Sequence, residues 1–225
     1  MRALTFVLVL ALLAVTTGVR GGEFAVEEVP GHGLGGSLVY VGATASDLGG
    51  DSRPGLALAL FGKRRPVVSG FCYRLGLEFS DKRNVGTVSQ SSSADGSLIY
   101  RGQGTVSLKY LQVVGELQFV GGLGSVTVVP YVGLAPAILI NQEVSADAED
   151  VSLGDLDWYS DFDMFGLVGV ELGYRRLRLD LQYAEGLGDL EASRDRAEGD
   201  WPPAPQFEPT NGRSRSFRVA AGVMF

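Results

Sequence analysis

The sequence contains few of the residues from which enzyme and metal sites are most often built. Its 225 residues include one cysteine, Cys72, and one histidine, His32. A single cysteine excludes an intramolecular disulfide, and the sequence distance to His32 disfavours a thiol nucleophile activated by that histidine. The 19 lysines and arginines are outnumbered by 26 acidic residues, which gives a net charge of -7. The chain therefore lacks an overall basic character, and we expect no nucleic-acid partner.

Long apolar runs are equally scarce, and the one at the N-terminus is too short to span a membrane. Residues 3–15 form an apolar run of about 13 residues, whereas a membrane helix needs roughly 20. Arg2 precedes this run and small residues follow it, as in a secretory signal peptide. Cleavage after Gly18 or after Gly21 fits, so the cleavage site stays open. The expected division is a signal peptide at 1–21, an N-terminal leader at 22–36 and an exported barrel domain at 37–225.

Glycine, by contrast, is abundant at 32 residues, and it lies in segments where apolar and polar residues alternate. A period of two is typical of β-strands with one apolar face. At the C-terminus, Phe217, Val219, Val223 and Phe225 share one face, and Arg218 lies on the other. Eight strands are expected on this basis, at residues 37–47, 54–61, 71–79, 111–119, 126–140, 162–174, 177–183 and 216–225.

The expected connections fall into two classes. Those at 62–66, 121–125 and 175–176 are short, and the one at 48–53 is also brief but lies at the opposite end. The remaining connections are long and polar, at 80–104, 141–161 and 187–215. Tight turns at one end and long loops at the other are typical of outer-membrane barrels, whereas such long loops are uncommon in compact soluble domains. The pattern predicts an all-β fold, an eight-stranded antiparallel up-and-down transmembrane β-barrel.

The charged residues of the expected strands fall on one face of the alternation. They are Arg74, Glu78, Glu116, Glu171, Arg175, Arg178, Asp180 and Arg218. The interior of an eight-stranded barrel is just wide enough for side chains to fill it, and buried charges persist when they are paired. We predict that all of these except Arg175, which belongs to a turn, form a structural charge network in the lumen. No catalytic, cofactor-binding or metal-binding residue is predicted.

The opposite face of the expected strands is aliphatic and aromatic. In a membrane this face meets lipid, and aromatic residues near strand ends are placed to form two interfacial girdles. Those residues are Tyr40, Phe61, Phe71, Phe79, Phe119, Phe162, Tyr174, Tyr183, Phe217 and Phe225. We predict that the closing strand carries a C-terminal barrel-insertion signal for the barrel-assembly machinery, made of Phe217, Val219, Val223 and Phe225.

The connections have compositions of their own. The basic turns at 63–65 and 175–176 would face the periplasm, either attracting anionic lipid head groups or simply being solvated. Residues 141–161 contain seven carboxylates and no lysine or arginine, so they either bind a divalent cation such as calcium or remain a solvated acidic loop. The proline-rich segment 187–215, which includes Trp201, is either a partner-binding tip or an extended surface loop.

Several stretches resemble the PorT-like outer-membrane β-barrel family. They are SLKYLQV at 107–113, VPYVG at 129–133, DFDMFGL at 161–167, LDLQY at 179–183, GLE at 76–78 and the closing strand at 216–225. Each is short, but their order and spacing extend over most of residues 37–225. The family usually has a proline near the position where Val114 stands here. The resemblance implies an eight-stranded barrel in the outer membrane without catalytic residues, and some relatives are linked to secretion and cell-surface assembly.

These features together favour a small outer-membrane protein of the cell envelope that acts as a structural element or through its long surface loops, without catalysis and without a cofactor. Its expected partners are outer-membrane lipid, the barrel-assembly machinery during insertion, and surface or secretion proteins. Two alternatives stay open, a narrow channel or solute-binding barrel and a soluble secreted lipocalin-like binder. The sequence identifies no ligand, and it leaves conduction and oligomeric state open.

Overall fold

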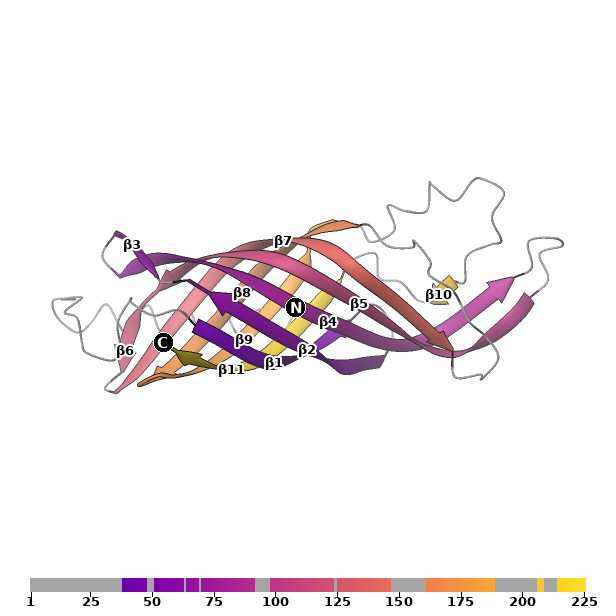
Figure 1. The fold of residues 1–225 in the computed structure, drawn as a ribbon, viewed down its shortest axis with the longest axis horizontal. Coiled ribbons are helices and arrows are strands. Elements are labelled where there is room, and N and C mark those ends of the chain that lie inside the picture. Colours follow the sequence, from indigo (N-terminus) through magenta and orange to yellow (C-terminus); the bar gives the residue numbers. More distant parts are fainter. Residues whose placement is uncertain are drawn as a thin grey trace.

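The computed structural model describes residues 38–47, 51–62, 64–68, 70–91, 98–123, 125–146, 161–188, 206–208 and 214–225. Within these residues every regular element is a strand, and the strands form one closed barrel (Figure 1). The expected signal peptide and leader, the centre of the acidic segment 141–161 and Trp201 lie outside the described residues. No helix in the described part of the chain is long and apolar enough to span a membrane.

Eight strands build the barrel wall. They are β1 (Leu38–Asp47), β2 (Asp51–Phe61), β4 (Phe71–Ser91), β5 (Leu98–Phe119), β7 (Val126–Ala146), β8 (Phe162–Tyr174), β9 (Leu177–Gly186) and β11 (Arg215–Met224). Each pairs antiparallel with the next strand of the wall, and β11 pairs with β1, which closes the sheet. Closure removes the free edges that would otherwise expose unpaired backbone groups. The predicted eight-stranded antiparallel barrel is confirmed, and each predicted strand overlaps one wall strand.

The two ends of the barrel differ. At one end, called the turn end here, β8 and β9 are joined by Arg175–Arg176 alone. The same end carries β3 (Arg65–Val68), which pairs with β4, and β6 (Gly121–Leu123), which pairs with β7. The C-terminus lies there too, because the Met224 amide donates to the Arg176 carbonyl at 2.9 Å. At the opposite loop end, the β4–β5 hairpin projects beyond the other strands, and β10 (Gln206–Glu208) pairs with β4 (Figure 1).

The predicted loop at 80–104 is wrong over most of its length. Strand β4 continues to Ser91, β5 begins at Leu98, and the two strands stay paired throughout this extension. The extension lacks a continuous apolar face, so hydrophobic alternation does not reveal it, whereas the ladder requires only backbone groups. Similarly, β7 extends to Ala146 by pairing with β5, which shortens the predicted acidic loop from its N-terminal side.

Alternation along the strands separates an apolar exterior from an interior that mixes polar and apolar side chains. On β2, Leu56 and Leu60 are 52 % and 54 % exposed, whereas Ala57 and Phe61 are at most 2 % exposed. Exposed large apolar side chains occur on all eight wall strands, for example Val41, Leu58, Leu75, Leu117, Val132, Phe162, Leu177 and Val219. The predicted apolar face therefore points outward.

Two aromatic residues expected in the girdles, Tyr40 and Phe61, point into the lumen instead. Each lies beside a cross-strand glycine that leaves room for its ring. A Cβ on Gly222 would come within 2.5 Å of the Tyr40 ring, and one on Gly76 within 2.4 Å of the Phe61 ring. Other expected girdle residues are exposed outside the barrel, Phe71, Tyr174 and Phe225 at the turn end and Phe162 and Phe217 at the loop end.

Candidate functional site

The seven residues of the predicted charge network all lie inside the barrel and are at most 4 % exposed. They come from five strands: Arg74 and Glu78 from β4, Glu116 from β5, Glu171 from β8, Arg178 and Asp180 from β9, and Arg218 from β11. Each occupies an inward position of its strand, so the pleat alone directs all seven toward the barrel axis. The structure joins them in two groups of ion pairs.

Glu171 is the centre of the group nearest the turn end. Its Oε2 accepts hydrogen bonds from Arg74 Nη1 at 2.8 Å and from the Tyr40 hydroxyl at 2.6 Å. Its Oε1 accepts one from Arg64 Nη2, and Arg178 Nε lies 3.1 Å from the same oxygen. A single carboxylate thus forms ion pairs with three guanidinium groups that are almost fully buried.

Arg74 extends this group to a second carboxylate. Its Nη2 donates to Glu116 Oε2 at 2.8 Å, and its Nε donates to the same oxygen at 3.1 Å. The Gln118 amide donates to that oxygen at 2.6 Å and accepts from Arg64 Nε, also at 2.6 Å. Arg74 Cζ lies 4.1 Å from the centre of the Phe61 ring, so an aromatic face covers the guanidinium.

The second group lies between β4, β9 and β11. Arg218 donates to Glu78 through Nη1 and to Asp180 through Nη2, the latter at 2.6 Å. The other oxygen of Asp180 accepts a hydrogen bond from the Tyr131 hydroxyl at 2.8 Å. Glu78 and Glu116 therefore bind different arginines.

Arg64 completes the charge balance, and its place in the lumen was not predicted. The sequence assigned it to a basic turn facing lipid head groups or solvent, but the structure buries it to 8 % exposure against Glu171. Strand β3 folds back on β4 beside it, which turns the neighbouring Arg64 toward the barrel mouth. The predicted network held four carboxylates and only three arginines, and that imbalance signals a missing cation.

Arg175, which shares the charged face of the alternation, is instead exposed in the β8–β9 turn. Its backbone has φ of 54°, the left-handed conformation that a two-residue antiparallel turn requires. The periodicity of β8 ends at Tyr174, so alternation no longer determines the direction of the Arg175 side chain. The lumen network thus contains Arg64, Arg74, Arg178 and Arg218 paired with Glu78, Glu116, Glu171 and Asp180.

A buried lysine lies nearer the loop end. Lys82 Nζ is 3.4 Å from the centre of the Phe165 ring and 5.0 Å from that of Tyr110. It also contacts Ser214 Oγ at 3.3 Å. The two rings meet edge to face, with centres 5.6 Å apart. Periodicity places Lys82 past the end of its predicted strand, so the sequence analysis missed this cluster.

The described residues contain no group of three or more histidine, cysteine, aspartate or glutamate side chains arranged to hold a metal ion. Cys72 is buried in the lumen with Sγ 3.8 Å from Gln118 Oε1, and His32 lies outside the described residues. Ion pairs and hydrogen bonds connect the inward side chains of β4, β5, β8, β9 and β11.

Comparison with known proteins finds no family model and no curated protein that matches this chain. Among solved structures it is similar to the outer membrane enzyme PagL, with 10 % identity, a TM-score of 0.44, and coverage of 84 % of this chain and 99 % of that one. It is also similar to Neisserial surface protein A (NspA), with 15 % identity, a TM-score of 0.37, and coverage of 84 % and 94 %. The strand pairing itself establishes the barrel fold.

Proposed function

We propose that the chain is an outer-membrane β-barrel with a filled lumen, which acts as a structural or interaction protein through its loop end and not as a catalyst. The observation that carries this proposal is the contrast between the two faces of the wall. Outside, Leu75 is 58 % exposed and Leu177 is 62 % exposed. Inside, Glu171 and Asp180 have no exposed surface and are paired with arginines.

A lipid environment explains the exterior. Monomeric soluble proteins rarely expose contiguous apolar patches above about 300–600 Å², whereas this wall carries exposed apolar side chains on every strand. The soluble lipocalin-like alternative needs an apolar interior for its ligand, whereas this interior contains paired charges beside its apolar cluster. Strands β1, β9 and β11 have 10 residues each, which matches the roughly 9–11 residues of a tilted membrane strand.

The loop end is the part of the protein best suited to meet a partner. The β4–β5 extension and β10 form an ordered, hydrogen-bonded ribbon there, and we assign surface or secretion proteins to it as partners. Kinship with the PorT-like family would agree with such a role. On the closing strand, Phe217, Val219 and Val223 are 40–42 % exposed and Phe225 is 77 % exposed. These outward side chains are available to the barrel-assembly machinery as the proposed insertion signal.

Cell fractionation tests the membrane assignment. The full chain, expressed in a Gram-negative host, is expected in the outer-membrane fraction, and unboiled detergent extracts should migrate faster on gels than boiled ones because the closed barrel resists unfolding. A known periplasmic protein and a known outer-membrane barrel serve as fractionation controls. Recovery in the soluble periplasm with no mobility shift would contradict the proposal and favour a soluble binder.

Planar-bilayer recording tests the filled lumen. Because four arginines and four carboxylates pair across the barrel, the reconstituted protein is expected to produce no discrete conductance steps. A porin of 16–18 strands, which leaves an aqueous channel, provides the positive control in the same bilayers. Reproducible single-channel openings of the reconstituted chain would instead identify it as a narrow channel.

A further inference from the structure

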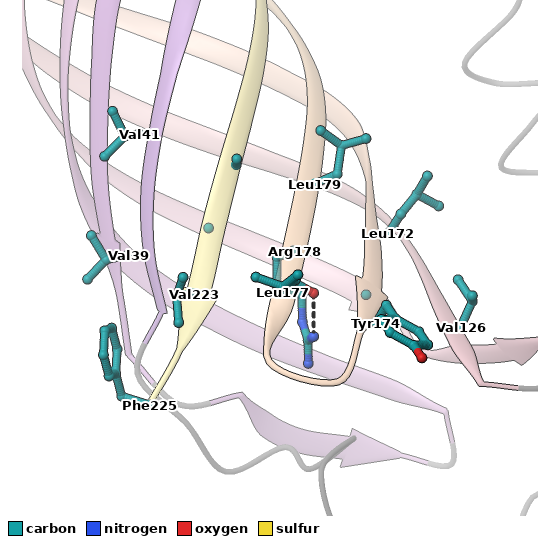
Figure 2. A pocket seen from close by; sticks show the side chains of 13 residues that line it. Val39, Val41, Val126, Leu172, Tyr174, Leu177, Arg178, Leu179, Val223 and Phe225 are labelled. Carbon is teal, nitrogen blue, oxygen red and sulfur yellow. Dashed lines mark hydrogen bonds between the residues drawn. The ribbon is translucent and has the colours of Figure 1, made fainter.

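The outer wall has an apolar groove near the turn end. The groove crosses β1, β11, β9, β8 and the start of β7 and has a volume of about 560 Å³ (Figure 2), within the range of roughly 300–1,000 Å³ typical of small-ligand sites. Val39, Val41 and Phe225 border one side, and Leu172 and Tyr174 border the other (Figure 2).

Ala221 makes the wall hollow at this place. Its cross-strand neighbours on the same outward face are Val41 of β1 and Leu179 of β9. A methyl group between these two branched side chains leaves a depression in the apolar wall. The depression lies on the outward face of the wall, and it opens sideways, toward the surroundings of the barrel.

Exposed positive charge lies at the turn-end side of the groove. The Arg175–Arg176 turn continues from Tyr174, and Arg175 Cζ lies 5.4 Å from the centre of the Tyr174 ring. Both arginines are exposed, and neither forms an ion pair with a carboxylate of the described residues. The described residues of the three connections at this end, 62–70, 120–125 and 175–176, include no aspartate or glutamate.

We propose that this groove binds one anionic phospholipid, with an acyl chain along Ala221 and the phosphate on Arg175 and Arg176. The inference rests on the proposed membrane location of the barrel. An acyl chain fits an apolar groove that opens sideways, and a head group then lies at the level of the turns. Guanidinium groups bind phosphate oxygens through paired hydrogen bonds.

Charge distinguishes this occupant from a second copy of the chain. A two-fold dimer through the groove would use the same patch on both copies and would place two Arg175–Arg176 turns at the same depth in the membrane. Four arginines, none of which forms an ion pair with a carboxylate of the described residues, would then face each other. An anionic lipid instead brings a negative charge to both arginines, and each basic residue near an anionic membrane surface contributes about fivefold to binding, or ~1 kcal/mol.

Native mass spectrometry of the full folded barrel in a neutral detergent provides the test, with phosphatidylglycerol and phosphatidylcholine as the probes. The wild-type protein is expected to retain one phosphatidylglycerol in preference to phosphatidylcholine.

Arg175→Asn with Arg176→Gln should weaken retention of phosphatidylglycerol about 25-fold. Asparagine is chosen at position 175 because it tolerates the positive φ of the turn. Ala221→Leu, which fills the groove, should abolish selective retention. Ala43→Leu, an outward alanine on β1 away from the groove, is the matched control and should bind as the wild type does.

Heat-dependent gel mobility of each variant separates the possible failures. The lipid site is overturned if the wild type retains both lipids equally. It is also overturned if the arginine and Ala221 variants stay folded and retain phosphatidylglycerol as the wild type does. Both results leave the membrane assignment intact. A dimer that forms through this face, and that Ala221→Leu disrupts, also overturns it. A protein that never enters membranes or detergent overturns the proposed function itself.

Discussion

Replacing Glu171 by glutamine is expected to lower the free energy of unfolding by about 3–5 kcal/mol, the usual effect of removing one partner from a buried ion pair. The change keeps the shape of the side chain but leaves Arg64, Arg74 and Arg178 without the carboxylate that joins them. Urea titration of the barrel in vesicles, followed by tryptophan fluorescence or gel mobility, measures the loss.

Glu143→Gln is the matched control for that experiment. Glu143 pairs with Lys109 on the same wall, but its side chain is 59 % exposed. Exposed pairs contribute about 0–1 kcal/mol, so this variant should unfold almost as the wild type does. If the two variants lose the same stability, the lumen network does not hold the barrel together, and its role must be sought elsewhere.

A second large effect is expected from a single methyl group at Gly169. A Cβ there would lie 2.4 Å from the Tyr131 hydroxyl and 2.7 Å from the Leu181 carbonyl oxygen. Gly169→Ala therefore forces the Tyr131 ring away from Asp180, which loses a buried hydrogen bond. Overpacking and the lost bond together should destabilise the barrel by about 2–4 kcal/mol. The measurement is the heating temperature at which the gel band changes from folded to unfolded mobility, which should be lower in the variant.

Gly166→Ala tests whether the effect comes from the lumen or from glycine itself. Gly166 is on the same strand but faces outward, where a Cβ would be 3.5 Å from its nearest neighbour, Leu187 Cδ2. This substitution should change stability by no more than about 0.5 kcal/mol. A barrel that tolerates both alanines equally would mean that Tyr131 is not fixed against Gly169.

The sequence predicts those parts of the fold that depend on alternation. Within a strand such as β9, a period of two is enough to assign Leu179 to the exterior and Asp180 to the lumen. It also identifies the four acids of the lumen network, since each occupies an inward position of its strand. The even number of strands and the two-residue turn at 175–176 follow from the same pattern.

The sequence fails where alternation stops determining side-chain direction. Arg64 and Arg175 both belong to turns, and the backbone path of each turn decides that the first enters the lumen while the second stays outside. Alternation also says nothing of strands with two polar faces, so it predicts a loop where the residues from Ser80 to Ser91 form a paired strand. Cross-strand partners, such as Tyr131 with Asp180, depend on register between strands, which one strand alone does not specify.

The β4–β5 ribbon has a consequence for how this surface can evolve. Strands of 21 and 22 residues extend roughly 70 Å at about 3.3 Å per residue, far more than the bilayer requires. Because inside and outside alternate with a period of two, adding or deleting residues in pairs on both strands changes the height of the ribbon and leaves every wall residue on its own face. The ribbon is in this sense an adjustable spacer, whose length can change while the barrel below stays the same.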